Sequence, residues 1–242
     1  MARYFAWSLL LVIVFSIFNP VVAHQPFFED KEFTAANPEL IKDPTISTAI
    51  YATLETPNDV DYYSFEGRRG ETIFLSITIP QIAGQENFTP TMALMGQGLP
   101  SSNLPNRVEK PKNYGSLILP PPENSTAFFE PFSRMSYWTR QEQNVTLPEN
   151  SSYQVAIWDD RGEVGRYVFV IGNKEVPGGD LAFPLKMRDY WKPVEPDSLA
   201  PNEGYPAEKR TISQAGPISQ EANRVQHQPI GELSQDLRLH IP

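Results

Sequence analysis

The sequence predicts an all-β fold, an antiparallel, jelly-roll-like β-sandwich with long loops, a short C-terminal helical segment and a disordered tail. Short stretches of alternating apolar and polar residues recur between residues 46 and 171, and Gly, Pro, Asn and Asp separate them. Residues 193–242 contain one aromatic residue, Tyr205, and recurrent prolines. Such a composition cannot bury enough apolar surface to offset the entropy of ordering, so this stretch is predicted to be the tail.

The first 23 residues are predicted to be a signal peptide. Arg3 supplies a positive charge, residues 5–18 are almost wholly apolar, and Asn19 and Pro20 interrupt the apolar run shortly before Ala23. A retained membrane anchor is the competing interpretation, although the run is shorter than the ~20 residues that span a bilayer as a helix. Cleavage after Ala23 predicts a mature chain that begins at His24, has no membrane span, and is secreted, periplasmic or on the cell surface.

The first half of the predicted sandwich domain, residues 24–192, contains the clearest strands. Residues 46–54 form the first, and residues 60–65 follow after a turn that contains Pro57. Isoleucine or leucine then occupies every second position of residues 72–80, which is typical of a half-buried strand. Pro80 is expected to end this strand, because proline cannot continue the hydrogen-bond ladder of a central strand.

The second half of the domain contains shorter candidate strands. Residues 153–158 and 166–171 are the stronger predictions, and a turn at residues 159–162 joins them. A helical turn over residues 182–191 is expected to pack on the edge of the sandwich. The weaker candidates are residues 91–95, 116–119, 133–138 and 144–147.

Two connections, residues 81–113 and 120–134, are predicted to be long and irregular, and functional residues concentrate on such loops. An aromatic group lies in and after the second one, and it departs from strict alternation. A platform that binds sugar or peptide is one interpretation. Burial in the core is the other, because each large aromatic side chain removes ~150–250 Å² from water. The group consists of Phe128, Phe129, Phe132, Tyr137 and Trp138.

Composition limits the classes of ligand and reaction. The chain carries a formal charge of -9, and loss of Arg3 with the signal segment makes this -10. An acidic chain without a basic run is poorly suited to nucleic acid or to anionic membranes. The absence of cysteine excludes disulfides, thiol catalysis and Cys-ligated metal sites. The histidines are His24, His227 and His240, so a Ser-His-Asp triad has no histidine in the predicted domain beyond its first residue.

The stretch NDVDYYSF, residues 58–65, carries the most informative motif. Asp59 and Asp61 precede an aromatic strand, a glycine turn and the alternating strand. This pattern resembles the bacterial pre-peptidase C-terminal domain, whose relatives include the collagen-binding modules of bacterial collagenases. The resemblance covers mainly residues 43–80, with a looser match at residues 153–171. It implies a jelly-roll-like β-sandwich without catalytic activity, used beside secreted enzymes as a binding or chaperone-like module.

The resemblance also implies a calcium site. Some relatives bind calcium through acids of an N-terminal linker together with acids at the start of this strand, and Ca²⁺ takes roughly six to eight oxygen ligands. Only Asp59 and Asp61 match the motif position by position. The alternative is that Asp59 caps a turn and Asp61 is a solvated strand end. The full set of corresponding positions is Glu29, Asp30, Glu32, Asn37, Asp59 and Asp61.

His24 provides a second metal hypothesis. A mature N-terminal histidine presents its α-amine and imidazole as a chelate that suits copper(II). The other histidines, His227 and His240, lie in the predicted tail, so no ordered second histidine is expected. A copper-binding periplasmic protein is therefore an alternative, and a histidine that merely follows the cleavage site is the simpler interpretation.

The sequence thus predicts a non-catalytic secreted or cell-envelope binding or structural module, with calcium as the candidate stabilising ion. Its expected partner is an extracellular polymer or an envelope protein. Copper binding at His24 is the first alternative. A carboxylate-based glycoside hydrolase is a weaker one, because glycoside hydrolysis needs only two acids at a set separation. The acid pairs considered are Asp159 with Asp160 and Glu123 with Glu130.

Overall fold

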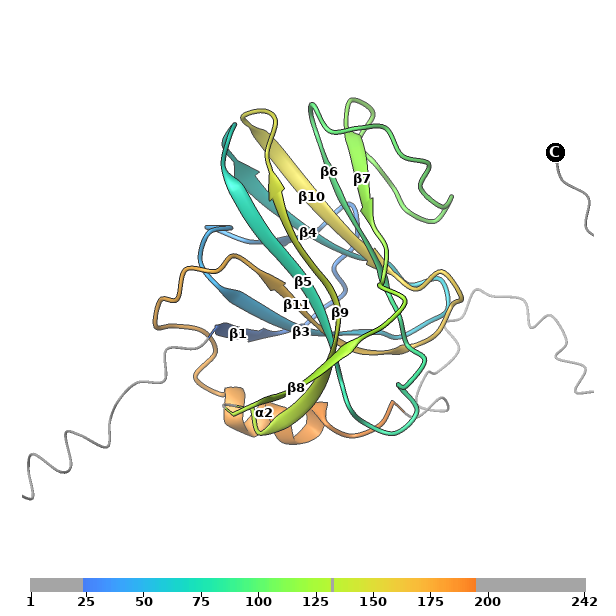
Figure 1. Ribbon diagram of the computed structural model, residues 1–242, viewed down its shortest axis with the longest axis vertical. Helices are drawn as coiled ribbons and strands as arrows, with labels where there is room; N and C mark the ends of the chain where they lie inside the picture. The colour runs from blue at the N-terminus through green and yellow to red at the C-terminus, as the bar shows by residue number, and fades with distance from the viewer. Residues whose placement is uncertain (1–23, 132, 195–242) are drawn as a thin grey trace, which may run out of the picture. The chain divides into compact units, whose positions relative to one another are not determined.

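The computed structural model describes residues 24–131 and 133–194. The predicted signal peptide, Phe132 and the predicted tail beyond residue 194 lie outside the described residues, and the division of the chain at residues 23 and 192 stays a prediction. The described residues form two facing β-sheets with one helix (Figure 1). The all-β sandwich predicted from the sequence is confirmed.

The first six strands alternate between the two sheets along the chain, whereas β6 and β7 share one sheet and β8 and β9 share the other. The six-stranded sheet has the order β1-β3-β11-β5-β9-β8 and the five-stranded sheet the order β2-β4-β10-β6-β7. The elements are β1 (Gln25–Phe28), β2 (Glu39–Leu40), β3 (Thr48–Leu54), β4 (Asp61–Gly67), β5 (Thr72–Pro80), β6 (Thr91–Gly96), β7 (Gly115–Leu119), β8 (Thr126–Glu130), β9 (Met135–Thr146), β10 (Ser151–Trp158), β11 (Gly165–Ile171) and α2 (Phe183–Tyr190).

Strands β1 and β2 were not predicted, and they are paired differently from the others. β1 runs parallel to β3, and β2 runs parallel to β4, whereas the remaining pairs are antiparallel. Both are short and come from the segment expected to be a linker. They are the outermost strands of the two sheets on one side of the sandwich, so the N-terminal segment crosses from one sheet to the other.

The alternating strand β5 is buried on both faces. Ile73, Leu75 and Ile77 lie in the core between the sheets, as the alternation predicts. The expectation of a half-buried strand was wrong, because Ser76 and Thr78 on the opposite face are buried too. β5 occupies the interior of its sheet, between β11 and β9, and neighbouring side chains cover its outer face.

Strand β9 joins two stretches that were predicted as separate strands. It pairs with β5 from Tyr137 to Thr146, and a register shift opposite residues 77 and 78 leaves Arg140 outside the ladder. Its polar middle resembles a loop in the sequence. The side chain of Gln141 is nevertheless buried, because its amide donates to the carbonyl oxygens of Pro90 at 2.6 Å and Leu119 at 3.3 Å. β8 likewise lies in a connection that was predicted to be irregular.

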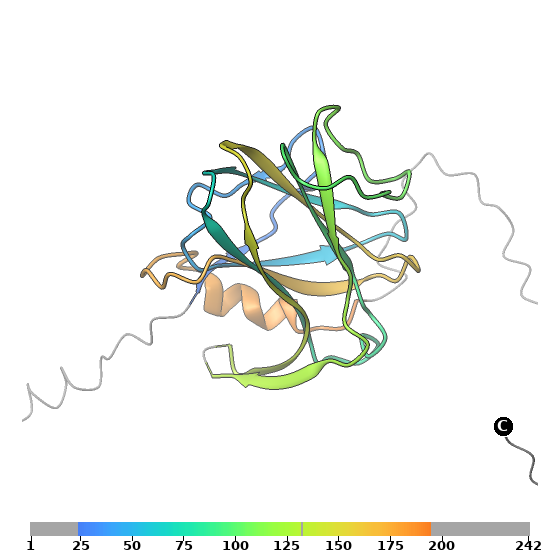
Figure 2. The same ribbon diagram turned by 45° about the horizontal axis from the view of Figure 1, so that its top comes forward.

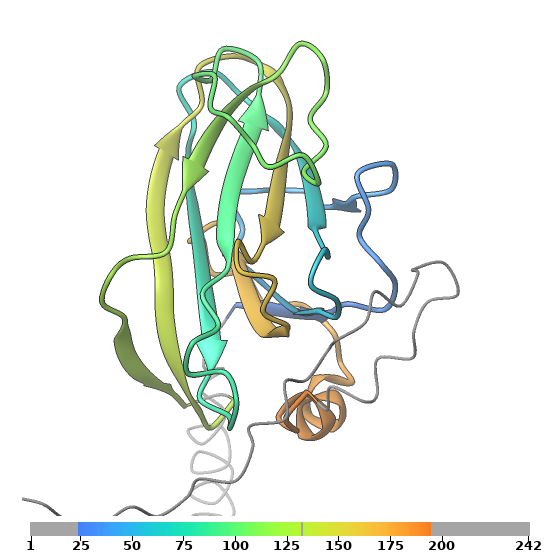
Figure 3. The same cartoon turned by 90° about the vertical axis from the view of Figure 1, so that its right-hand side faces the viewer.

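Helix α2 coincides with the predicted helical turn, but it covers a sheet face and not the sandwich edge (Figures 2 and 3). Phe183, Met187 and Tyr190 pack against Tyr51 of β3 and Val168 of β11. Tyr51 and Val168 point outward from the six-stranded sheet, and α2 shields this apolar face from water. Among the described residues, no helix is long and apolar enough to cross a membrane.

Leu75→Ala is expected to lower the free energy of unfolding by about 2–5 kcal/mol, because the fully buried side chain leaves a cavity. Leu185 of α2 is 78% exposed and serves as the matched control. Leu185→Ala is expected to change stability by less than about 0.5 kcal/mol. Urea unfolding followed by tryptophan fluorescence measures both variants, and equal losses would contradict the assignment of Leu75 to the core.

Candidate metal centre

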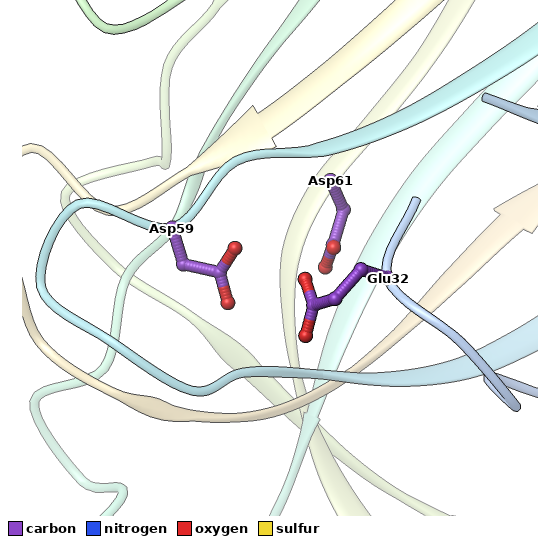
Figure 4. A group of neighbouring side chains, drawn as sticks. All are labelled: Glu32, Asp59 and Asp61. Atoms are coloured by element: carbon purple, nitrogen blue, oxygen red, sulfur yellow. The ribbon is translucent and has the colours of Figure 1, made fainter. Parts of the chain in front are cut away.

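Three carboxylates from two segments converge beside the start of β4. Oxygens of Glu32, Asp59 and Asp61 all lie within 4.8 Å of one another, and Figure 4 shows their carboxylates turned toward a common space. Asp59 and Asp61 belong to the approach and first residue of β4, whereas Glu32 lies in the segment between β1 and β2. The group therefore joins the N-terminal segment to the body of the sandwich.

Anchors on both sides position Glu32. On one side, the backbone N–H of Glu29 donates to the carbonyl of Tyr51 at 3.0 Å. On the other, the carbonyl of Phe33 accepts from the N–H of Tyr62 at 2.6 Å. The buried ring of Phe33 also packs edge-on against Tyr63, with the ring centroids 5.5 Å apart. These contacts hold the short segment against the sandwich and place the Glu32 carboxylate beside β4.

Asp59 caps a turn and also belongs to the carboxylate group. Its Oδ2 accepts a hydrogen bond from the N–H of Glu55 at 2.7 Å, and its own N–H donates to the carbonyl of Thr56 at 3.0 Å. Burial raises the pKa of Asp59, although backbone hydrogen bonds oppose the shift. The two interpretations offered by the sequence, turn cap and ligand, are thus compatible at this residue.

Asp61 is not a solvated strand end, because its side chain is 0% exposed. Its Oδ2 accepts from the hydroxyl of Tyr167 at 2.5 Å, and the hydroxyl of Tyr63 lies 2.7 Å from that of Tyr167. Oδ1 has no hydrogen-bond partner among the described residues. Burial raises the pKa of Asp61 well above its usual value, and the nearby charges of Glu29 and Asp59 raise it further.

A fourth carboxylate, Glu29, lies beside the group. Its Oε2 accepts from the N–H of Thr53 at 3.0 Å, while its buried Oε1 has no partner among the described residues. Burial raises the pKa of Glu29 to about 8, and repulsion from Glu32 and Asp59 contributes. The ion pairs within the described ranges join Lys186 to Asp180 and Lys192 to Asp189, so no cationic side chain pairs with these four acids.

A cavity borders two of the four acids. Glu29 and Glu32 line a cavity of about 680 Å³ that extends to Arg166 and to Lys186 and Tyr190 of α2. The guanidinium of Arg166 lies over the ring of Tyr190, 5.2 Å from the ring centroid. An ion in this cavity can therefore reach Glu29 and Glu32, whereas Asp61 is buried and does not line the cavity.

Two of the linker positions named from the sequence lie outside this group. Asp30 is exposed, and its carboxylate is not one of the three that converge. Asn37 is exposed in a tight turn, where its N–H donates to the carbonyl of Thr34 at 3.0 Å.

Sequence reasoning missed Tyr63 and Tyr167, the tyrosines whose hydroxyls connect to Asp61. Inward-facing tyrosines in apolar strands are a usable signal, because a buried hydroxyl requires a polar partner.

His24 lies directly before β1, where its Nδ1 forms a hydrogen bond with the hydroxyl of Ser47. It is the single histidine of the described ranges, and His227 and His240 lie outside them. Burial lowers the pKa of its ring, while the carboxylates of Glu130 and Glu175 oppose the shift. A copper site there would depend on the α-amine and imidazole of His24 itself, together with ligands other than histidine.

The aromatic group named from the sequence does not form one platform. Phe128 stacks on Tyr137 with ring centroids 5.7 Å apart, while Phe129, its neighbour on β8, is largely exposed. Trp138 packs against the core between the sheets, and the guanidinium of Arg140 lies 5.5 Å from its ring centroid. Neighbouring strand residues point to opposite faces, which separates these side chains. Phe132 lies outside the described residues.

The acids considered for glycoside hydrolysis organise loops. The carboxylate of Asp159 accepts from the backbone N–H groups of Arg161 at 2.9 Å and Glu163 at 3.1 Å. Asp160 accepts from the indole N–H of Trp158 at 2.6 Å and the hydroxyl of Thr91 at 2.7 Å. In the second pair, Glu130 accepts from the N–H of Ser133 at 2.5 Å, and Glu123 is exposed.

No family model and no curated protein matches this chain. Among solved structures, the chain is similar to the pre-peptidase C-terminal domain of collagenase from Bacillus anthracis, with 14% identity, coverage of 59% of this chain and 98% of that one, and a TM-score of 0.33. It is also similar to Aeromonas hydrophila PliG, a periplasmic inhibitor of g-type lysozyme. The identity is 12%, the match covers 62% of this chain and 98% of that one, and the TM-score is 0.30. A third similar structure is CorA, a surface-associated copper-binding protein of Methylomicrobium album BG8. The identity is 8%, the match covers 63% of this chain and 99% of that one, and the TM-score is 0.28. The first match is the domain that the motif at residues 58–65 resembles.

In buffer with EDTA, the free energy of unfolding is expected to fall as the pH rises from about 4.5 to about 8. The folded-state pKa values of Glu29 and Asp61 are raised, so the folded protein binds more protons than the unfolded chain across this window. A pKa that differs by one between the folded and unfolded states corresponds to about 1.4 kcal/mol. Urea unfolding at several pH values measures the slope. Glu29→Gln should flatten it, and a stability that instead rises with pH would contradict the burial of ionisable carboxyls.

Proposed function

We propose that the protein is a non-catalytic, secreted or cell-envelope binding module in which a calcium ion, held by Glu32, Asp59 and Asp61, fastens the N-terminal segment to the sandwich. The observation that carries the proposal is the carboxylate of Asp61. It is fully buried, one of its oxygens has no partner among the described residues, and it faces two further acids.

The energetics of burial favour a cation at this place. An unpaired carboxylate in an apolar interior is costly, and like charges nearby raise the cost further. The cost is met either by protonation or by a positive charge. A divalent ion would neutralise the ionised acids and supply a partner for the free Oδ1 of Asp61.

The ligand set suits calcium better than softer ions, and its spacing is compatible with calcium. Two oxygens on one Ca²⁺ lie at most about 5 Å apart, twice the metal–oxygen distance, whereas for Mg²⁺ this limit is about 4.2 Å. The oxygens of Glu32, Asp59 and Asp61 lie within 4.8 Å of one another, a spacing that one Ca²⁺ can bridge. The group contains no imidazole or thiolate, the ligands that zinc and copper prefer.

Glu29 is the expected additional ligand, because its Oε1 is buried, unpartnered among the described residues and close enough to perturb Asp61. Water from the adjoining cavity would complete the coordination. The segment that carries Glu29 and Glu32 leads from β1 in one sheet to β2 in the other. Calcium would therefore link the edges of the two sheets and hold the N-terminal segment in one conformation. A partner, either an extracellular polymer or an envelope protein, would then meet a fixed surface.

Calcium is expected to raise the melting temperature of the protein over its value in EDTA. Binding to the folded state alone contributes ~2.7 kcal/mol at a hundredfold excess over Kd, or about 5–10 °C for a chain of this size. Glu32→Gln and Asp61→Asn should abolish the increase. Asp30→Asn is the matched control, because Asp30 lies in the same segment but outside the group, and it should retain the increase.

Stability in EDTA shows whether a substituted variant has lost only calcium binding or has also lost its folded structure. In EDTA at about pH 8, Glu32→Gln should be at least as stable as the unsubstituted protein, because it removes a repelling charge. If copper(II) raises the melting temperature, His24→Ala abolishes that increase and calcium has no effect, the copper alternative would be favoured. No response to either ion would contradict the proposal and leave Glu29 and Asp61 as protonated buried groups.

A further inference from the structure

Four strands form the outer edges of the two sheets, and β8 differs from the other three. At the edge of β1, the N–H of Asp180 donates to the carbonyl of Pro26 at 2.7 Å. At the edge of β7, the N–H of Ser116 donates to the carbonyl of Pro100 at 2.5 Å, and β2 has only two residues. β8 has five residues and lies at the margin of the six-stranded sheet (Figure 3).

The pairing of β9 with β5 shows which backbone groups of β9 face β8. The N–H of Gln81, directly after β5, donates to the carbonyl of Ser136 at 2.9 Å, so the polar backbone groups of Ser136 point toward β5. Because these groups alternate in direction along a strand, those of Tyr137 point toward β8. Pro80 lies opposite Tyr137 in β5 and has no N–H to donate, which agrees with this direction.

Two residues of β8 consequently turn their backbone groups away from the sheet. Phe128 lies opposite Tyr137 in the register of β8 and β9, so its N–H and C=O are bonded to β9. The N–H and C=O groups of Ala127 and Phe129 therefore face outward. Among the described residues, these four groups have no hydrogen-bond partner in the protein. Such a row of free groups is a template for pairing with another strand.

The edge of β8 lacks the features that usually prevent such pairing. Its sequence, TAFFE, contains no lysine and no proline, and its register with β9 has no bulge. Phe128 is 40% exposed and Phe129 is 60% exposed. Burying these two rings against another strand would remove apolar surface from water.

Contacts at both ends hold β8 in its extended form. Before the strand, the guanidinium of Arg140 donates to the hydroxyl of Ser125 at 2.5 Å. At its end, the carboxylate of Glu130 accepts from the N–H of Ser133 at 2.5 Å. A strand that is already ordered loses little conformational entropy when another strand pairs with it.

We propose that β8 pairs with β8 of a second copy of this chain, antiparallel about a two-fold axis at Phe128. In this register Ala127 of each copy lies opposite Phe129 of the other, and each such pair exchanges two hydrogen bonds. All four outward groups of each copy then have partners. A register centred on Ala127 or on Phe129 would pair the other residue with a position outside β8.

The side chains of β8 are compatible with this register and with the antiparallel direction. The two Phe128 rings meet at the axis, and each Phe129 ring lies across from the small Ala127 of the other copy. Glu130 is the only charged residue of β8, and it lies opposite the uncharged Thr126 of the second copy. A parallel arrangement in register would instead place the two Glu130 carboxylates side by side.

Pairing through β8 joins two six-stranded sheets into one continuous sheet and leaves the N-terminal segment of each copy free. β8 and β1 are the opposite edges of the six-stranded sheet, so the carboxylate groups lie away from the dimer axis. Two copies of a binding module on one dimer bind a repetitive partner more tightly than one copy does. The dimer itself requires neither calcium nor an identified ligand.

Analytical ultracentrifugation of the purified chain tests the dimer, in a concentration series that reaches about 1 mM. The interface is small, so a weak, reversible monomer–dimer equilibrium is expected, with the same dissociation constant in EDTA and in calcium. Ala127→Pro removes an outward N–H and should weaken dimerisation at least tenfold. Ala127→Ser is the matched control, because it keeps the N–H, and it should dimerise within about twofold of the unsubstituted chain. Urea unfolding checks that both variants are folded.

Disulfide cross-linking tests the register, because the chain has no cysteine of its own. Phe128→Cys places two thiols at the axis, where opposite Cα atoms of an antiparallel pair lie about 4.5 Å apart and can form a disulfide. Thr126→Cys places them four residues apart along the paired strands, or about 13 Å, which is too far. Under mild oxidation, Phe128→Cys should form a covalent dimer at least tenfold faster than Thr126→Cys.

A chain that stays monomeric at about 1 mM would overturn the proposal. So would an Ala127→Pro variant that dimerises as the unsubstituted chain does, because the contact would then lie elsewhere. Equal cross-linking rates for the two cysteine variants would contradict the register.

Discussion

A carboxylate enclosed by two apolar sheets is the constraint around which this molecule is organised. Asp61 begins β4 with its side chain turned into the core, and the hydroxyl of Tyr167 from the other sheet donates to it. Since the single proton of the Tyr167 hydroxyl is used there, the hydroxyl of Tyr63 must donate to Tyr167. This chain of hydrogen bonds links the sheets through polar contacts, and it leaves one oxygen of Asp61 without a partner among the described residues.

The N-terminal segment packs around the buried Asp61 and completes both sheets. Residues 24–41 form the outer strand of each sheet, place Glu29 and Glu32 beside Asp61, and provide Phe33 to the core. The same segment, together with residues of β3, lines a cavity of about 480 Å³.

Local pattern predicted the elements whose residues alternate or stay apolar, such as β3, β5, β10 and β11, because a strand buried between two sheets requires apolar side chains at fixed positions. It failed where long-range partners decide the structure. β9 contains a polar middle that is stabilised by carbonyl groups far away in the sequence, and β1 and β2 are strands through parallel pairing with β3 and β4. The aromatic residues of β8 and β9 are divided between two faces, because neighbouring residues of a strand point to opposite sides.

The sequence by itself determined the sandwich class, the resemblance of residues 58–65 to a known secreted domain, and the presence of Asp59 and Asp61 before an aromatic strand. Only the tertiary structure decided that Asp61 is buried, that Glu32 and Glu29 come close to it while Asp30 and Asn37 do not join the group, and that a cleft opens between the sheet edges. The physical reason is that burial and charge proximity are properties of segments packed together. Neighbours such as Glu29 and Asp30 can have the same chemistry and lie in different environments.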